Sequence, residues 1–214
     1  MKFFRKLFDK QDKNTKEAKG KGDYYYVAEF KDGYALAIRK PEDFHLRDVV
    51  IIDENYEKIG NTKYAHTVSL QIDEYKIFYV YSKGSSYVRK MGLLDKNLNV
   101  ILPLKYDKIH YLAEGKFSAK MHNCTTDIYD MVTGTLVTNI KGEVVSLTKY
   151  DGKNYYQFFM KDIGKYGYYD DNFELVIEAD YDALYGIDSE GRIPFDKNGK
   201  IGVINLKTGK ISFW

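Results

Sequence analysis

Apolar and polar residues alternate along most of the chain in short segments of four to six residues. Residues 34–38 and 75–80 are clear examples, and such segments are rich in Val, Ile, Tyr and Phe. A period of two with this composition is typical of β-strands that bury one face. Beyond residue 11 no stretch keeps a helical period for three turns. We therefore expect an all-β fold in which helix is scarce.

Turn-forming residues separate the alternating segments, as at residues 95–97, 133–134, 171–172 and 196–199. Gly and Asn tolerate positive φ, and the side chain of Asp accepts hydrogen bonds from nearby backbone amides. These connections are typical of β-hairpins. The sequence thus predicts antiparallel strands that are joined in chain order.

The same pattern of residues recurs about every forty positions. From Gly92 to Asp107 and from Gly167 to Asp182 the spacing is the same, fifteen residues, and weaker copies lie near residues 50–53, 127–130 and 202–205. Self-similarity at such a period indicates a repeat architecture. We expect five units, each of which buries its apolar face only against its neighbours.

Within the repeat, the recurring residues have structural explanations. A glycine allows backbones to approach closely or to bulge, an Asp accepts turn amides, and a Tyr-Asp pair forms a buried corner. The positions to which we assign these structural roles are Gly92, Asp95, Tyr106, Asp107, Gly167, Asp170, Tyr181, Asp182 and Gly202.

The phase of the repeat leaves two architectures open. The region from residue 23 begins with the second half of a unit and ends with a first half, so the two ends together make one unit. A propeller-like closed ring would pair the first strands with the last and would leave no exposed edge. An open array of hairpins can begin at any phase, so both alternatives stand.

The repeat resembles the WG-repeat family of bacterial proteins, most clearly at residues 91–115 and 166–191. The shared pattern is an aromatic or apolar residue, Gly, two apolar residues, Asp, a turn, a Val-Ile pair and Tyr-Asp-x-Ile. In that family a Trp usually precedes the Gly, whereas here Met91, Tyr166 or Ile201 does. The resemblance implies a scaffold of antiparallel strands that serves as an interaction module, generally without enzymatic activity, and it supplies no catalytic residues.

Residues 1–22 differ in composition from residues 23–214, which we expect to form the β-repeat domain. They hold eight Lys and Arg but three Asp and Glu, and their apolar residues have the spacing of a short amphipathic helix. Such a basic extension could dock on the domain, stay flexible or hold an anionic membrane surface weakly. The residues of this candidate anchor are Phe3, Phe4, Lys6, Leu7 and Phe8.

Composition and motifs argue against several kinds of chemistry. The single cysteine, Cys124, cannot form an intrachain disulfide, which favours a reducing compartment such as the cytoplasm. With 33 Lys and Arg against 31 Asp and Glu, and with scattered lysines, no nucleic-acid surface is indicated. Asp95, Asn97 and Asn99 begin like a calcium loop, but the closing ligands are missing. We expect no metal, no cofactor and no enzyme.

Tyrosine is the remaining positive signal, because 21 tyrosines exceed what one core easily buries. Exposed Tyr supplies interface area at a low entropic cost. We therefore expect a non-catalytic module that binds a protein partner, an inhibitor or immunity-type factor being one form of it. The alternatives are a peripheral scaffold at the inner face of the membrane, docked through residues 2–10, and a glycan-binding or glycan-processing protein. The candidate binding residues are Tyr25, Tyr79, Tyr81, Tyr87, Tyr155 and Tyr168.

Overall fold

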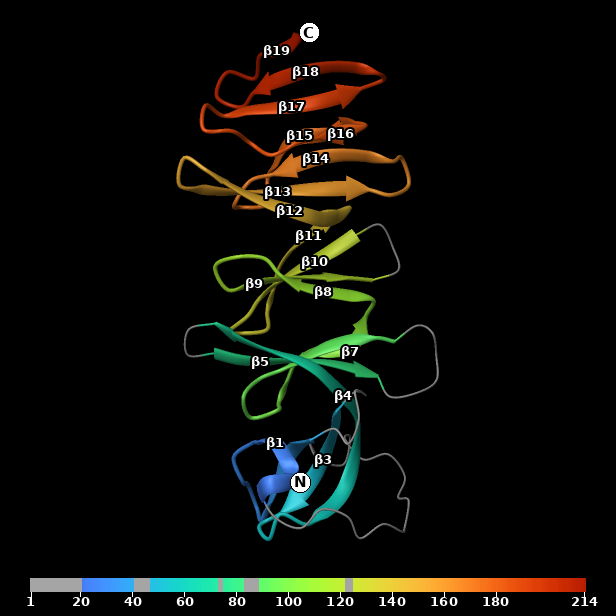
Figure 1. The fold of residues 1–214 in the computed structure, drawn as a ribbon, viewed down its shortest axis with the longest axis vertical. Coiled ribbons are helices and arrows are strands. Elements are labelled where there is room, and N and C mark those ends of the chain that lie inside the picture. Colours follow the sequence, from blue (N-terminus) through green and yellow to red (C-terminus); the bar gives the residue numbers. More distant parts are fainter. Residues whose placement is uncertain (1–20, 41–46, 73–74, 83–88, 122–124) are drawn as a thin grey trace. The chain divides into compact units, whose positions relative to one another are not determined.

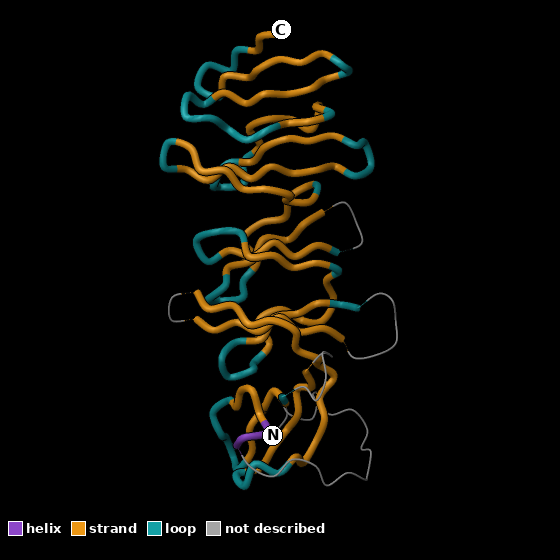
Figure 2. The backbone as a smooth tube through the Cα atoms, viewed as in Figure 1, coloured by secondary structure: helices purple, strands orange, loops and turns teal. Residues whose placement is uncertain are grey.

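The computed structural model describes residues 21–40, 47–72, 75–82, 89–121 and 125–214. These residues form nineteen β-strands and one 3-10 helix, η2 (Lys21–Asp23), and Figure 2 shows how completely strands dominate the described chain. All strand pairs are antiparallel, which confirms the all-β prediction. The candidate anchor in residues 2–10, for which we left a short amphipathic helix and a flexible tail open, lies outside the described residues. No helix in the described part of the chain has the length and apolarity that crossing a bilayer requires.

The chain divides into two compact units, Met1–Lys108 (unit 1) and Ile109–Trp214 (unit 2). The boundary falls within the region 23–214 for which the sequence indicates one repeat domain. It also falls beside Tyr106 and Asp107, where one repeat passes into the next.

Unit 1 contains one seven-stranded sheet with its strands in chain order (Figure 1). The fifteen residues of β4 pair with β3 through their first half and with β5 through their second half. Unit 1 therefore consists of two four-stranded meanders that share β4. Its strands are β1 (Tyr24–Val27), β2 (Tyr34–Arg39), β3 (Arg47–Asp53), β4 (Lys58–Ile72), β5 (Tyr75–Ser82), β6 (Met91–Leu94) and β7 (Val100–Tyr106).

Unit 2 contains three separate four-stranded meanders, so the described strands make five meanders in all and the five predicted repeats are confirmed. In the first, the strands are β8 (Lys108–Tyr111), β9 (Lys116–Lys120), β10 (Thr125–Asp130) and β11 (Leu136–Lys141). The second has β12 (Glu143–Tyr150), β13 (Lys153–Met160), β14 (Lys165–Tyr169) and β15 (Leu175–Tyr181). The third has β16 (Ala183–Leu184), β17 (Arg192–Lys197), β18 (Lys200–Asn205) and β19 (Ile211–Phe213).

The strand pairing does not close a ring. Among the described strands, β1 pairs with β2 alone and β19 pairs with β18 alone. The closed-ring alternative is therefore wrong, and the repeats form an open array. The chain does not need a closed ring to bury its apolar side chains, because within each unit neighbouring meanders cover one another's apolar faces.

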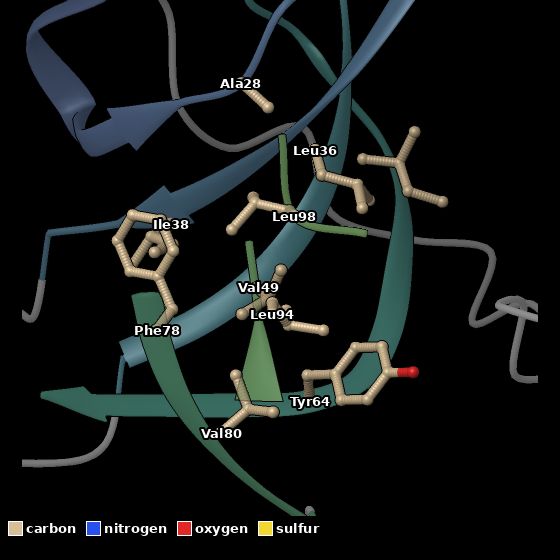
Figure 3. Packing of buried hydrophobic residues seen from close by; sticks show 10 residues of the cluster. Ala28, Leu36, Ile38, Val49, Tyr64, Phe78, Val80, Leu94 and Leu98 are labelled. Atoms are coloured by element: carbon tan, nitrogen blue, oxygen red, sulfur yellow. The ribbon is translucent and has the colours of Figure 1, made fainter. Parts of the chain in front are cut away.

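Apolar side chains fill the space between neighbouring meanders. In unit 1, Leu36 and Val49 lie in one buried cluster with Phe78 and Leu94, so that side chains of β2 and β3 meet those of β5 and β6 (Figure 3). In unit 2, one cluster joins the sheets of β8–β11 and β12–β15, and a second joins the latter to β16–β19. Full burial of each such side chain contributes about 1.5–3 kcal/mol, so packing between meanders adds substantially to stability.

The repeat glycines lie where two backbones approach closely. A Cβ on Gly167 would lie 2.4 Å from the carbonyl oxygen of Ile177, and one on Gly202 would lie 2.4 Å from that of Ser212. At Gly92 the corresponding distance, to the oxygen of Leu102, is 2.7 Å. These glycines let the last strand of the meander pair tightly with the strand before it.

The hairpin turns differ in one respect from the sequence-based expectation. Asp95 accepts hydrogen bonds from the amides of Asn97 and Asn99, and Asp170 accepts those of Asn172 and Glu174. The residue with positive φ, however, is Leu98 in the first turn and Phe173 in the second, rather than an Asn. Both of these side chains are buried, and their packing offsets the cost of the left-handed conformation.

At the corners between repeats, the tyrosines are buried and the acidic residues pair with lysines. Asp107 pairs with Lys90, and Asp182 accepts hydrogen bonds from Lys165 Nζ and from the amide of Asn198, both at 2.6 Å. The Lys165 ammonium, together with that amide, holds the pKa of Asp182 below its ordinary value. Both lysines stand two residues before a repeat glycine, a periodic signal that our sequence analysis did not use.

Candidate functional site

Four meanders carry a β-bulge at the same place, near the start of their last strand. In each pair the register slips by one residue, as between Leu93 and Leu94 of β6 against β7. The extra residue is β-branched and apolar in every case. These residues are Ile59 in β4, Ile101 in β7, Val137 in β11 and Val176 in β15.

In unit 2 the bulges turn apolar side chains toward solvent. In a regular strand one of two successive residues faces the core, but Leu136 and Val137 are both exposed, and so are Leu175 and Val176. The exposed fractions of Val137 and Val176 are 49% and 41%. The two pairs occupy equivalent positions in consecutive sheets that share a buried core. We call these four residues the bulge surface.

A second kind of bulge occurs in the first strand of a meander. The register slips around Tyr25 in β1 and around Val145 in β12, and both residues are exposed. Tyr25 thus lies in unit 1 at a position equivalent to that of Val145 in unit 2. Its exposure follows from the bulge rather than from the run of three tyrosines.

The predicted tyrosine candidates differ in their exposure to solvent. Tyr168 is fully buried, and its hydroxyl donates a hydrogen bond to the carbonyl oxygen of Tyr185 at 2.9 Å, so its assignment to a binding surface was wrong. Tyr168 lies in β14, the third strand of its meander. The two faces of this strand belong to two different buried clusters, so the alternation of side chains does not bring one face to solvent. The other candidates are Tyr25, which is exposed, Tyr79, Tyr81 and Tyr155, which are half-buried, and Tyr87, which lies outside the described residues.

Sequence reasoning missed the bulge surface and Tyr185, whose side chain is exposed. The signal for the bulge surface was present, because a pair of aliphatic residues follows the turn in several repeats. Our sequence analysis assigned no role to that pair, since the pattern of residue types does not show where the register slips.

The described residues include no group of three His, Cys, Asp or Glu side chains arranged to hold a metal ion. Cys124, the single cysteine of the sequence, lies outside the described part of the chain. The side chains of the bulge surface are aliphatic and can make apolar contacts.

Among the titratable residues that the structure describes, Tyr156 has the largest shift of its pKa. Its ring stacks on Phe173 with a centroid distance of 4.8 Å, and its buried hydroxyl has no hydrogen-bond partner among the described residues. Burial, followed by the negative charges of Glu114 and Asp171, raises the pKa of Tyr156 to about 12. The ring is therefore a core element with a hydroxyl that costs stability.

We expect Tyr156→Phe to raise the free energy of unfolding by about 1 kcal/mol at neutral pH, because it removes a buried polar group without a partner. An unfolded Tyr ionises near pH 10, whereas Tyr156 keeps its proton in the folded state up to about pH 12. Wild-type stability should thus decline as the pH rises from about 10 to 12, and the variant should lack this part of the decline. Urea unfolding at several pH values measures both effects, and a variant less stable than wild type at neutral pH would contradict the assignment.

Comparison with protein families matches residues 91–123 and 166–200 to the WG containing repeat. No curated protein matches the sequence. Among solved structures, the chain is similar to BamB from Moraxella catarrhalis, with 11% identity, a TM-score of 0.44 and coverage of 92% of this chain and 66% of that one. It is also similar to dihydro-heme d1 dehydrogenase NirN in complex with DHE, with 12% identity, a TM-score of 0.45 and coverage of 87% and 46%.

The chain spans less than two thirds of the length of BamB and about half that of NirN, and similarity at this level carries no argument about function. Each match spans the last two strands of one meander, β6 and β7 or β14 and β15, and the first two strands of the next, and in both matches the glycine, the turn Asp and the Tyr-Asp corner are present. The repeat pattern found in the sequence therefore agrees with the family model of the WG containing repeat at residues 91–123 and 166–200.

Proposed function

We propose that this chain is a non-catalytic β-repeat module that binds a protein partner through the bulge surface of unit 2. One observation carries the proposal: two consecutive sheets expose a pair of aliphatic residues at the same bulge. Bulges re-aim side chains, and apolar residues grouped on a surface are typical of protein interfaces.

The chemistry of these side chains favours a partner with an apolar patch of its own. Leu136, Val137, Leu175 and Val176 offer no charge and no side-chain hydrogen bond, so the gain on binding comes from removing apolar area from water. Stable β-strands hold the residues, which lowers the entropic cost of ordering them on binding. Repetition of the pair extends the contact beyond one sheet, as in other repeat proteins whose binding surfaces run across several units.

The test compares affinity capture by the wild-type chain and by the double variant Val137→Asp, Val176→Asp. Because both side chains are exposed, the substitutions should leave the fold intact, which circular dichroism checks. The matched control is Val132→Asp, Ile163→Asp, which places the same charges on exposed aliphatic residues in hairpin turns of the same unit.

We expect one protein to be retained by the wild type and by the control and to bind the bulge variant at least about tenfold more weakly. Equal retention by the bulge variant would show that the partner binds elsewhere. If the wild-type chain retains no protein from the lysate of its own cell, recognition of a protein partner is the wrong function.

A further inference from the structure

Strand β19 forms an open edge of the last sheet. The amide of Asn205 donates to the carbonyl oxygen of Lys210 at 2.9 Å, and the amide of Trp214 donates to that of Ile201 at 3.1 Å. Residues 210, 212 and 214 therefore face β18. Because hydrogen-bonding directions alternate along an antiparallel strand, Ile211 and Phe213 direct their backbone N–H and C=O groups away from β18. No described strand lies on that side.

The side chains of this edge are apolar and exposed. Phe213 and Trp214 are 58% and 81% exposed, and Ile211 is also exposed. Soluble proteins usually protect an open edge with charge, proline or a covering segment, because an apolar edge with free backbone groups accepts another strand. This edge has none of these protections within residues 211–214.

We propose that β19 pairs with β19 of a second copy of this chain in an antiparallel arrangement about a two-fold axis at Ser212. In this register Ile211 lies opposite Phe213 of the second copy, and the two residues exchange two N–H···O hydrogen bonds at each end of the strand pair. Apolar residues thus face apolar residues, and the free backbone groups of both edges are satisfied.

The charges also fit this register. Lys210 lies opposite Trp214 of the second copy, where an ammonium can approach the indole face, and no like charges are directly opposed along the paired residues. Ser212 lies opposite itself, in a pair without hydrogen bonds, in which Cα atoms are about 4.5 Å apart. A short strand of this kind should give a weak dimer that depends on concentration.

The self-opposed position provides a register-specific test. In Ser212→Asp two carboxylates would face each other, and in Ser212→Lys two ammonium groups would, so each variant alone should dimerise about fivefold more weakly than wild type. Mixing the two variants places Asp opposite Lys and should restore association. The matched controls are Ser189→Asp and Ser189→Lys, which make the same charge changes at an exposed turn of the same meander.

Sedimentation of the full chain from low micromolar to near-millimolar concentration measures these associations. We expect wild type and both Ser189 controls to dimerise alike. A wild-type chain that stays monomeric throughout would overturn the proposal, and so would Ser212 variants that dimerise like wild type or fail to associate when mixed. The Val137→Asp, Val176→Asp variant should dimerise like wild type. The proposed dimer and the proposed binding of a protein partner can therefore be disproved separately.

Discussion

Gly167→Ala is expected to lower the free energy of unfolding of unit 2 by about 3 kcal/mol. The added Cβ would lie 2.4 Å from the carbonyl oxygen of Ile177 and 2.6 Å from the ring of Phe158. Neither neighbour has room to retreat, because Ile177 belongs to the strand ladder opposite Tyr168 and the ring of Phe158 lies in a buried cluster. The strain therefore enters both the sheet and the core beneath it.

Urea unfolding followed by circular dichroism measures this loss. Gly186→Ala is the matched control in the same unit, because its Cβ would meet no atom closer than Thr148 Oγ1 at 3.9 Å and its φ is not left-handed. The control should stay within about 0.5 kcal/mol of wild type. If Gly167→Ala changed stability no more than the control, the close approach would not explain why the repeat holds glycine there.

The second large effect is expected for Tyr168→Ala, which should destabilise unit 2 by about 4 kcal/mol. The ring is fully buried in the cluster that joins the second and third sheets of unit 2, alongside Ile193 and Phe195. Its removal leaves a cavity between two sheets and frees the carbonyl oxygen of Tyr185 from its hydrogen bond. The variant should show reduced stability rather than a selective loss of binding.

Two further variants separate the contribution of the Tyr168 ring from that of its hydroxyl group. Tyr168→Phe keeps the ring and loses only the hydroxyl, so it should cost about 1 kcal/mol. Tyr185→Ala removes an exposed ring and keeps the accepting carbonyl, so its effect should be small. Thermal and urea unfolding rank the three variants, and a Tyr168→Ala protein as stable as wild type would mean that this ring is not a core element.

The repeat itself could be predicted from the sequence because its signals are local. Alternation predicted strands, and the Gly, Asp and Tyr-Asp positions each depend on a backbone contact within one meander or with the next. The aspartates illustrate this, since a carboxylate that accepts amides two and four residues ahead leaves a pattern readable along the chain.

The binding surface could not be predicted in the same way, because it depends on contacts between sheets. Four successive residues of β2, from Ala35 to Ile38, are buried, since the two faces of that strand belong to different apolar clusters. Alternation therefore does not assign one face of a strand to solvent, as our interpretation of the tyrosines assumed. The bulges cause the opposite error, because they expose aliphatic residues such as Val176 that a regular strand would bury.

The long strand β4 makes the first two repeats inseparable. Its two halves serve different meanders, whereas each meander of unit 2 has four strands of its own. An opening fluctuation that frees β3 from β4 also loosens the support of β5, so unit 1 should exchange its backbone amide hydrogens as a single foldon. In unit 2 the sheet of β16–β19 can fray while its neighbours stay closed. The two halves of one repeat array thus combine an all-or-none module with one that opens stepwise.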